Sequence, residues 1–313
     1  MFIDNLIDRI KLLQNPTVAG LDPKLEYLPH CIIDEAVGLF GKTFKAAGYA
    51  ISKFNMQVID VLCDIVPAIK PQFAYYEMYG LDGLSALYET VSYAKQKGML
   101  VIGDGKRNDI GSTAKAYSCA YLGKTDLFGI KSPCMDVDAL TVNPYLGIDG
   151  IQPFIEDCLT YGKGIFVLVK TSNPSSGQLQ DIKINETAIF EFIARLVDDW
   201  SDGHEGRYGY GPVGAVVGAT YPHQAIKVRD MMSKSYILIP GYGAQGGTAE
   251  DCLPSFKKDR LGGLINASRS LVFAYGTKRW ADRYDGENYT TIIRDEAVRM
   301  KLEIIDAFGG ESF

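Results

Sequence analysis

The chain has 313 residues, of which 47% are hydrophobic and 22% charged, and its 32 basic and 38 acidic residues give a formal charge of −6. This composition is typical of a soluble globular protein and argues against a general nucleic-acid binder, which normally carries a basic face. No apolar run approaches the roughly 20 residues that span a bilayer. We therefore expect neither nucleic acid nor a membrane as a partner.

The first fourteen residues alternate apolar and charged side chains, which predicts an amphipathic helix rather than a signal peptide. We therefore expect a cytoplasmic protein. The six cysteines are scattered without a CxxC pair, which favours free thiols. The three histidines form no HxH or HxxxH pair, so we expect no histidine-rich metal site, while a carboxylate-bound Mg²⁺ stays open.

Eight short apolar runs rich in β-branched residues, each bounded by turn residues, predict eight strands. These runs are residues 18–21, 67–69, 100–103, 139–142, 165–169, 214–217, 236–239 and 263–265. The segments between them have helical periodicity, with room for one or two helices in 33–66 and single helices over 81–97 and 188–200. This alternation predicts one α/β domain over residues 1–313, a closed (β/α)₈ TIM barrel. An open doubly wound sheet is the alternative.

Three segments fall outside the repeating pattern. Residues 172–185 follow the fifth strand on the expected active-site face, where we predict a lid. Residues 202–212 are rich in glycine and precede the sixth strand on the opposite face, where we expect a surface insertion. Residues 271–313 add a C-terminal helical extension after the last strand.

Polar and charged residues follow most of the predicted strands. In a TIM barrel the active site lies at the carboxyl ends of the strands, so we expect these residues to converge on one mouth. They are Asp22, Lys70, Asp104 to Asp109, Lys170 to Asn173, residues 240–247 and Asn266 to Arg269.

The run Asp104-Gly-Lys106-Arg-Asn-Asp109 is the strongest chemical signal. Asp104 and Lys106 are two residues apart, so at a strand end their side chains point to the same side, and Lys70 from the neighbouring strand can join them. Alternating carboxylates and ammonium groups in a partly buried pocket stay mutually charged and provide a proton donor in a preorganised field. An ordinary charged surface turn is the alternative interpretation.

A second signal comes from the loops after the last two strands. Four glycines in residues 241–247 surround Gln245, and Arg269 follows the next strand. Glycine lets the backbone approach an anion closely, and an arginine matches phosphate oxygens. These loops are the usual phosphate site of barrels, so a phosphorylated ligand is favoured over a structural turn. No Walker A or GxGxxG pattern occurs at a strand–helix junction, so no nucleotide cofactor is indicated.

Five segments resemble, in their usual order, blocks of the orotidine 5′-phosphate decarboxylase family, closest to its longer bacterial branch. They are Ala68 to Gln72, Asp104 to Thr113, Thr171 to Pro174, Pro240 to Gly247 and Asn266 to Arg269. The resemblance implies a homodimeric barrel that converts orotidine 5′-phosphate to uridine 5′-phosphate and CO₂ in pyrimidine biosynthesis. It also implies that neither a metal nor an organic cofactor takes part.

The resemblance further implies roles for individual residues. Lys70, Asp104, Lys106 and Asp109 match the family's charged array, in which Lys106 protonates C6 of the pyrimidine and Asp104 faces the substrate carboxylate. Asp109 would reach into the active site of the partner subunit.

The remaining matched residues would bind substrate. Asp22 would bind the ribose hydroxyls and Ser172 the pyrimidine edge, while Thr113 would lie beside Asp109. Gln245 and Arg269 would bind the phosphate.

Three other functions remain open at this stage. A sugar-phosphate lyase or aldolase on the same barrel would use Mg²⁺ at a similar DxKxxD run. A Schiff-base aldolase would use Lys70 or Lys170. A non-catalytic ligand-binding barrel is the third, although binding alone does not need clustered carboxylates that would repel an anionic substrate.

Overall fold

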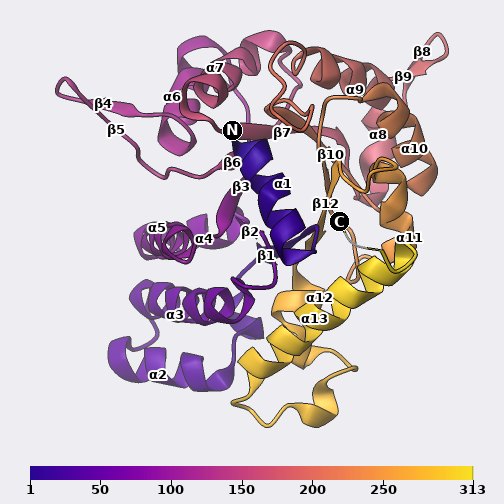
Figure 1. Ribbon diagram of the computed structural model, residues 1–313. Coiled ribbons are helices and arrows are strands. Elements are labelled where there is room, and N and C mark those ends of the chain that lie inside the picture. The colour runs from indigo at the N-terminus through magenta and orange to yellow at the C-terminus, as the bar shows by residue number, and fades with distance from the viewer. Residues whose placement is uncertain (312) are drawn as a thin grey trace.

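The computed structural model describes residues 1–311 and 313, and its central feature is a closed barrel of parallel strands surrounded by helices (Figure 1). The order around the barrel is β1-β12-β11-β10-β7-β6-β3-β2. Each predicted strand is present, so the predicted (β/α)₈ barrel is confirmed and the open sheet was the wrong alternative. The strands are β1 (Thr17–Leu21), β2 (Ala68–Pro71), β3 (Leu100–Arg107), β6 (Ala139–Val142), β7 (Gly164–Lys170), β10 (Val213–Val217), β11 (Ile237–Ile239) and β12 (Gly263–Ala267).

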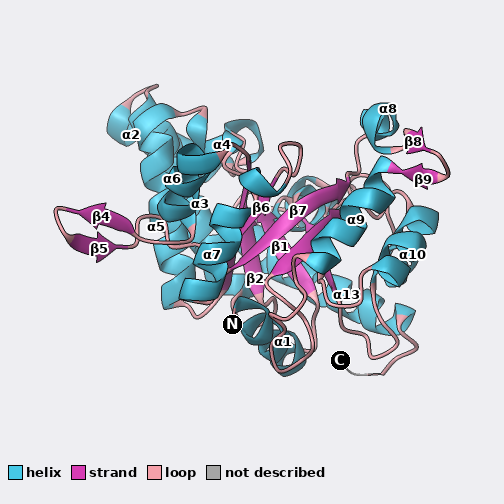
Figure 2. Cartoon of the chain, turned by 90° about the horizontal axis from the view of Figure 1, so that it is seen from above, coloured by secondary structure: helices cyan, strands magenta, loops and turns pink. Residues whose placement is uncertain are grey.

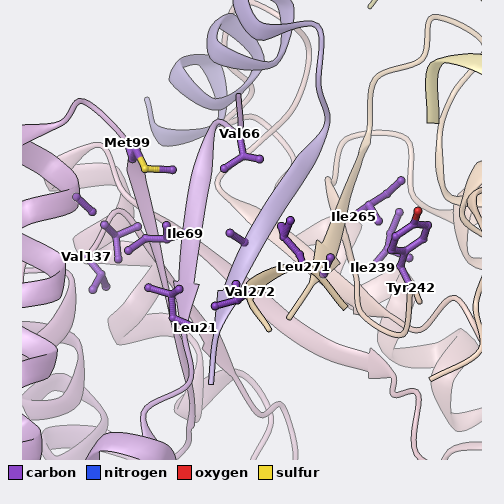
Figure 3. Close-up of a cluster of buried hydrophobic side chains, with 14 of the residues drawn as sticks. Leu21, Val66, Ile69, Met99, Val137, Ile239, Tyr242, Ile265, Leu271 and Val272 are labelled. Atoms are coloured by element: carbon purple, nitrogen blue, oxygen red, sulfur yellow. The ribbon is translucent and has the colours of Figure 1, made fainter. Parts of the chain in front are cut away.

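The barrel strands are buried on both faces, as their continuous apolar runs require. In β1, Ala19 and Leu21 pack outward in the layer between strands and helices, whereas Val18 packs inward. Figure 3 shows part of the outer layer, with Leu21 and Ile69 lying between the strands and the surrounding chain.

Helices cover the outside of the barrel. The predicted helices over 81–97 and 188–200 are confirmed, and residues 33–66 hold two helices. No helix in the described residues combines the length and the apolar character needed to cross a membrane. The α-helices after α1 are α2 (His30–Phe40), α3 (Phe44–Leu62), α4 (Ala74–Glu77), α5 (Gly80–Gln96), α6 (Gly111–Tyr121), α7 (Gln152–Tyr161), α8 (Gly177–Gln180), α9 (Ile189–Asp199), α10 (Pro222–Met231), α11 (Ala249–Cys252), α12 (Arg269–Val272) and α13 (Tyr289–Ala307). Short 3₁₀ helices cover Leu25–Tyr27, Ile148–Gly150, Pro174–Ser176, Leu253–Ser255, Ala274–Gly276 and Ala281–Arg283.

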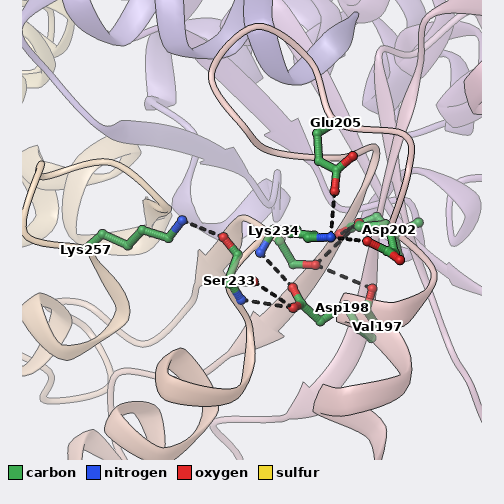
Figure 4. Close-up of polar contacts among 10 residues, drawn as sticks. Val197, Asp198, Asp202, Glu205, Ser233, Lys234 and Lys257 are labelled. Atoms are coloured by element: carbon green, nitrogen blue, oxygen red, sulfur yellow. Dashed lines mark hydrogen bonds and ion pairs between the residues drawn. The ribbon is translucent and has the colours of Figure 1, made fainter.

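The amino end of the barrel is closed by α1 (Phe2–Leu13) and by the 202–212 insertion. The apolar face of α1 packs into the inner core cluster with Val18 and Tyr210. The Tyr208 hydroxyl donates to Asp8 Oδ1 of α1 at 2.7 Å. Lys234 is ion-paired with Asp202 and Glu205 in the same insertion (Figure 4). The insertion therefore lies opposite the strand ends that carry the predicted site.

Two short hairpins were not predicted. β4 (Thr125–Leu127) and β5 (Ile130–Ser132) form one that projects from the barrel between α6 and β6 (Figures 1 and 2). β8 (Lys183–Ile184) and β9 (Thr187–Ala188) form the other, beside α8. The 172–185 segment is therefore a folded excursion after β7, on the active-site face.

Candidate active site

A cavity of about 540 Å³ opens at the carboxyl ends of the barrel strands. The predicted residues that line it come from different strands and lie together as the barrel geometry requires. Those given a role are Asp22, Lys70, Asp104, Lys106, Ser172 and Gln245, and Thr171, Asn173, Pro240, Asn266 and Ser268 were also expected at the mouth. The remaining lining residues are Gln72, Tyr75, Thr141, Leu168, Gln180, Val216 and Leu238.

Asp104 is the centre of the charged array. Its two carboxylate oxygens are shared between two lysines: Lys70 Nζ lies 2.5 Å from Oδ2, and Lys106 Nζ lies 2.5 Å from Oδ1. The side chains of Asp104 and Lys70 are 9% and 6% exposed, whereas that of Lys106 is 44% exposed. Lys106 is thus the member of the array that is open to a bound molecule.

Burial and charge act in opposite directions on this array. Burial disfavours a charged Asp104, but Lys70 and Lys106 outweigh it and hold the pKa of Asp104 well below its usual range. Burial likewise disfavours a charged Lys70, but Asp104 and Asp22 outweigh it and raise the pKa of Lys70. Asp104 and Lys70 are therefore both charged at neutral pH.

Two neutral side chains complete the surroundings of Asp104, and sequence reasoning did not single out either. Thr141 Oγ1 donates to Asp104 Oδ1 at 2.9 Å, and Gln72 Nε2 donates to Oδ2 at 2.9 Å. Gln72 stands two residues after Lys70, so the strand alternation that places Lys70 in the mouth could have found it. Thr141 is inside the apolar β6 run, where only the closed barrel shows which side it faces.

The backbone of β3 is shaped to present Lys106. Lys106 has a positive φ of 47°, and its amide donates to Thr141 Oγ1 at 3.0 Å. A Cβ on Gly103 or Gly105 would lie 2.6 or 2.8 Å from the ring of Phe73, so both positions need glycine. The Asp-Gly-Lys spacing is therefore required by packing as well as by the charges.

Asp22 and Asn266 offer unused hydrogen-bonding capacity to the cavity. Within the described residues, Asp22 Oδ1 and Asn266 Oδ1 are buried side-chain oxygens without a hydrogen-bond partner. Both residues line the cavity. Buried polar atoms are normally satisfied, so these two acceptors are suited to hydroxyl or amino groups of a ligand.

A smaller cavity of about 110 Å³ adjoins the first and shares Asp22, Gln245 and Asn266 with it. Arg269 and Lys24 also line it, and each cation lies over an aromatic ring: Arg269 is 5.8 Å from the Tyr27 centroid, and Lys24 is 5.6 Å from the same ring. Two cations and an exposed glutamine amide suit an anionic group. Sequence reasoning missed Lys24, although it stands only two residues after Asp22 at the end of β1.

The 241–247 loop has the tight conformation that its glycines predict. Gly241, Gly243 and Gly246 have positive φ values of 105°, 72° and 92°. The amides of Gly243 and Gly247 donate to carbonyls within the loop, at 2.8 and 3.1 Å. The glycines therefore fold the loop so that Gln245 borders both cavities. The positive charge that would attract an anion comes from the neighbouring Lys24 and Arg269.

Ser172 lines the cavity, but Lys170 does not, which corrects the expectation that the whole 170–173 run faces the mouth. Leu168 pairs with Val216, and both line the cavity, whereas Lys170 pairs with the next residue, Val217. This register shift places one extra residue in β7, so the alternation breaks and Lys170 turns outward with Val217.

Asp109 and Thr113 lie outside the cavity of their own chain. Asp109 is partly exposed, and its Oδ1 accepts from the Ile110 amide at 2.8 Å. Thr113 is exposed on α6. The structure therefore does not bring these two residues to the array formed by Lys70, Asp104 and Lys106.

The cysteines and the potential metal ligands form no further site in the described residues. All six cysteines are free thiols. In the described part of the chain, no group of three or more His, Cys, Asp or Glu side chains is placed to hold a metal ion. The carboxylate at the centre of the cavity is surrounded by lysines, which compete with a cation for Asp104.

The family model and similar curated proteins point to the same family. The family model described as "Orotidine 5′-phosphate decarboxylase / HUMPS family" matches residues 46–284. The curated orotidine 5′-phosphate decarboxylase of Rhodopirellula baltica is 44% identical, over 92% of this chain and 93% of its own. That of Caldicellulosiruptor saccharolyticus is 41% identical, over 88% of this chain and 90% of its own.

A solved structure agrees in fold. The Leishmania donovani OMP decarboxylase superposes with a TM-score of 0.69 at 28% identity, covering 96% of this chain and 98% of that one. The resemblance carried by the five sequence segments is thereby confirmed. This chain belongs to the orotidine 5′-phosphate decarboxylase family of enzymes.

Proposed function

We propose that this chain converts orotidine 5′-phosphate to uridine 5′-phosphate and CO₂, with Lys106 as the proton donor. The observation that carries the proposal is the position of Lys106, which is half exposed to the cavity and held 2.5 Å from Asp104. The adjoining pocket with Arg269 and Lys24 supports it, because the substrate is a phosphate ester. The names of the relatives that share nearly the whole chain support it further.

In the proposed step, the bond between C6 and the carboxylate carbon breaks and its electron pair stays on C6. The Lys106 ammonium stabilises this developing negative charge and then gives its proton to C6, and the neutral amine regains a proton from water. The charged Asp104 disfavours the substrate carboxylate more than the transition state, in which that negative charge is leaving. Lys70 keeps Asp104 ionised during the cycle.

The rest of the substrate would be held away from the reacting carbon. Arg269, Lys24 and Gln245 would bind the phosphate in the smaller cavity. The orphan oxygen of Asp22 would accept a hydrogen bond from a ribose hydroxyl, and Ser172 would bind the pyrimidine edge. Binding energy from such remote groups can be used to orient the reacting part of the substrate.

Asp109 and Thr113 would act in the active site of a second copy, so the working form would be a homodimer. Mixing two inactive variants tests this. In a Lys106→Met and Asp109→Ala heterodimer, one of the two sites keeps both native residues. An equal mixture that re-equilibrates should regain about a quarter of the native activity, because half of the dimers are mixed. No recovery after subunit exchange would refute a role in the partner's site.

The state of Lys70 and the position of Lys170 both argue against a Schiff-base aldolase. A Schiff-base lysine needs a neutral amine that reaches the substrate. Lys70 is held charged by Asp104 and Asp22, and Lys170 lies outside the cavity. The competing proposal is a Mg²⁺-dependent enzyme that acts on a sugar phosphate, and the experiment must distinguish it from the decarboxylase.

The experiment is an ultraviolet assay of orotidine 5′-phosphate with purified protein in EDTA. Loss of the substrate band with CO₂ release is the expected result. No change in EDTA, with turnover of a sugar phosphate once Mg²⁺ is restored, would overturn the proposal.

A further inference from the structure

Lys170 is a fully buried cation that the proposed reaction does not use. It ends β7, and its whole side chain is 0% exposed. The ammonium lies 2.8 Å from Asp181 Oδ1 and 4.5 Å from the centroid of the Tyr221 ring. Asp181 is the only carboxylate with which Lys170 is ion-paired in the described residues.

Asp181 belongs to the excursion after β7 and directly follows α8. It also accepts from Gln224 Nε2 of α10, at 3.0 Å. A Cβ on Gly177 would lie 2.7 Å from Asp181 Oδ2, so the start of α8 is packed tightly against this carboxylate. The ion pair therefore connects a barrel strand, the excursion and a covering helix.

The neighbours of this pair in the chain, Thr171 and Gln180, form a second set of contacts between the end of β7 and α8. Gln180 Oε1 accepts from the Thr171 amide at 3.0 Å, and Gln180 Nε2 donates to Thr171 Oγ1 at 2.8 Å. Thr171 Oγ1 in turn donates to Asn173 Oδ1 at 2.6 Å. The residues on both sides of Ser172 are thus held by contacts that begin at Gln180 and Asp181.

Among these contacts, the pair between Lys170 and Asp181 is the one that joins two charges. A buried ammonium without its partner is strongly unfavourable, because nothing replaces the water that it has lost. Any displacement of Asp181 from β7 leaves Lys170 in that state, although the Tyr221 ring offers partial compensation. The excursion is therefore tied to the barrel by a contact that is costly to break.

We propose that Lys170 is a positioning residue that, through Asp181, holds the 171–181 segment over the cavity and fixes Ser172 for the base of the substrate. The proposal rests on the proposed function for the identity of that substrate. It does not make Lys170 a catalytic residue, since its ammonium does not reach the cavity.

The test compares Asp181→Asn, Lys170→Met and the double variant with Lys227→Met as a control. Lys227 is also paired with a carboxylate, Glu191 at 3.4 Å, in a pair that joins α10 to α9, and the other oxygen of Glu191 accepts from the Ala188 amide, outside residues 171–181. Two readouts are taken: kcat and KM for orotidine 5′-phosphate, and hydrogen exchange of the amides in residues 172–186.

Asp181→Asn should lower kcat/KM by about 10- to 100-fold, the scale of a misplacement near 1 Å, mainly through KM because the Lys106 array is untouched. Exchange in 172–186 should become faster. The double variant should recover part of both losses, since it no longer buries an unpaired ammonium. Lys227→Met should match the native protein in both readouts.

Unchanged kinetics and exchange in Asp181→Asn would overturn the proposal, as would a double variant worse than the sum of the single ones. The exchange readout does not depend on activity. If the native protein leaves orotidine 5′-phosphate intact, the proposed function fails, and faster exchange in Asp181→Asn still shows whether the pair holds the segment. If Lys170→Met does not fold, Asp181→Asn with its half-exposed side chain gives the answer.

Discussion

Replacing Lys106 with Met should abolish turnover while leaving the fold and substrate binding nearly intact. Asp104 keeps Lys70 at 2.5 Å and the donors Thr141 and Gln72, both at 2.9 Å, so its charge stays compensated. Lys106 itself is 44% exposed, and Met is an unbranched chain of similar length. The variant should therefore unfold at nearly the native temperature.

The size of the effect follows from the two tasks given to this one group. Proton donation by a positioned side chain contributes about 10²- to 10⁴-fold. Stabilisation of the developing charge by a preorganised group contributes about 10²- to 10³-fold. Since both tasks are lost together, kcat should fall by about 10⁴-fold or more, whereas KM should change little because the Arg269 pocket is untouched.

The assay follows the ultraviolet band of the substrate, using protein made in a host that lacks its own decarboxylase. Lys115→Met is a matched control: Lys115 Nζ lies 2.7 Å from Asp157 Oδ1, with side-chain exposures of 43% and 5%, but this pair joins α6 to α7 outside the cavity. The control should keep native kcat. A Lys106→Met protein within about tenfold of native kcat would refute the reasoning, because neither task then contributes on the expected scale.

Three further predictions concern charge, phosphate and packing. Asp104→Asn removes the carboxylate with which the buried Lys70 is ion-paired, so urea unfolding at pH 7 should show a loss of about 3–5 kcal/mol. The lowered pKa of Asp104 makes this loss constant between about pH 5 and 9; it should shrink as the pH falls below about 4, the unfolded value, and a loss that instead grows there would contradict the sign. Arg269→Ala should lower kcat/KM for orotidine 5′-phosphate by about 10- to 100-fold, the equivalent of one charged hydrogen bond, but leave turnover of orotidine without phosphate unchanged. Arg283→Ala, which removes another arginine stacked on a ring, is its control, and an equal loss on both substrates would exclude a phosphate contact. Gly103→Ala should cost about 1–3 kcal/mol in urea unfolding, because its Cβ would meet the buried Phe73 ring at 2.6 Å. Gly38→Ala, a helical position with nothing within 4 Å, should stabilise by up to about 1 kcal/mol, and the opposite order would contradict the packing.

The barrel could be predicted because its strands are buried on both faces and are therefore continuous apolar runs in the sequence. β3 was predicted to end at Gly103 but extends to Arg107, because polar residues at the mouth interrupt the apolar signal while the pairing continues. The hairpins β4–β5 and β8–β9 were missed, since strands of two or three residues carry almost no periodicity.

In the site, too, some features follow from the local sequence, whereas others depend on how the strands pair. Lys70 lies one residue before the end of β2 and Lys170 ends β7, and nothing in their sequence positions tells that one side chain faces the mouth and the other the helices. The difference is the extra residue in β7, which is visible only in the pairing with β10. Thr141 reaches the site through the closure of the barrel, so its role needed the structure, whereas Lys24 could have been found from its position two residues after Asp22.

The most direct test of the central claim is nuclear magnetic resonance of orotidine 5′-phosphate turned over by the native protein in D₂O with EDTA. Protonation of C6 by an exchangeable ammonium predicts uridine 5′-phosphate that carries deuterium at C6, together with one equivalent of CO₂. Unchanged orotidine 5′-phosphate, or a product with hydrogen rather than deuterium at C6, would contradict decarboxylation by the Lys106 array.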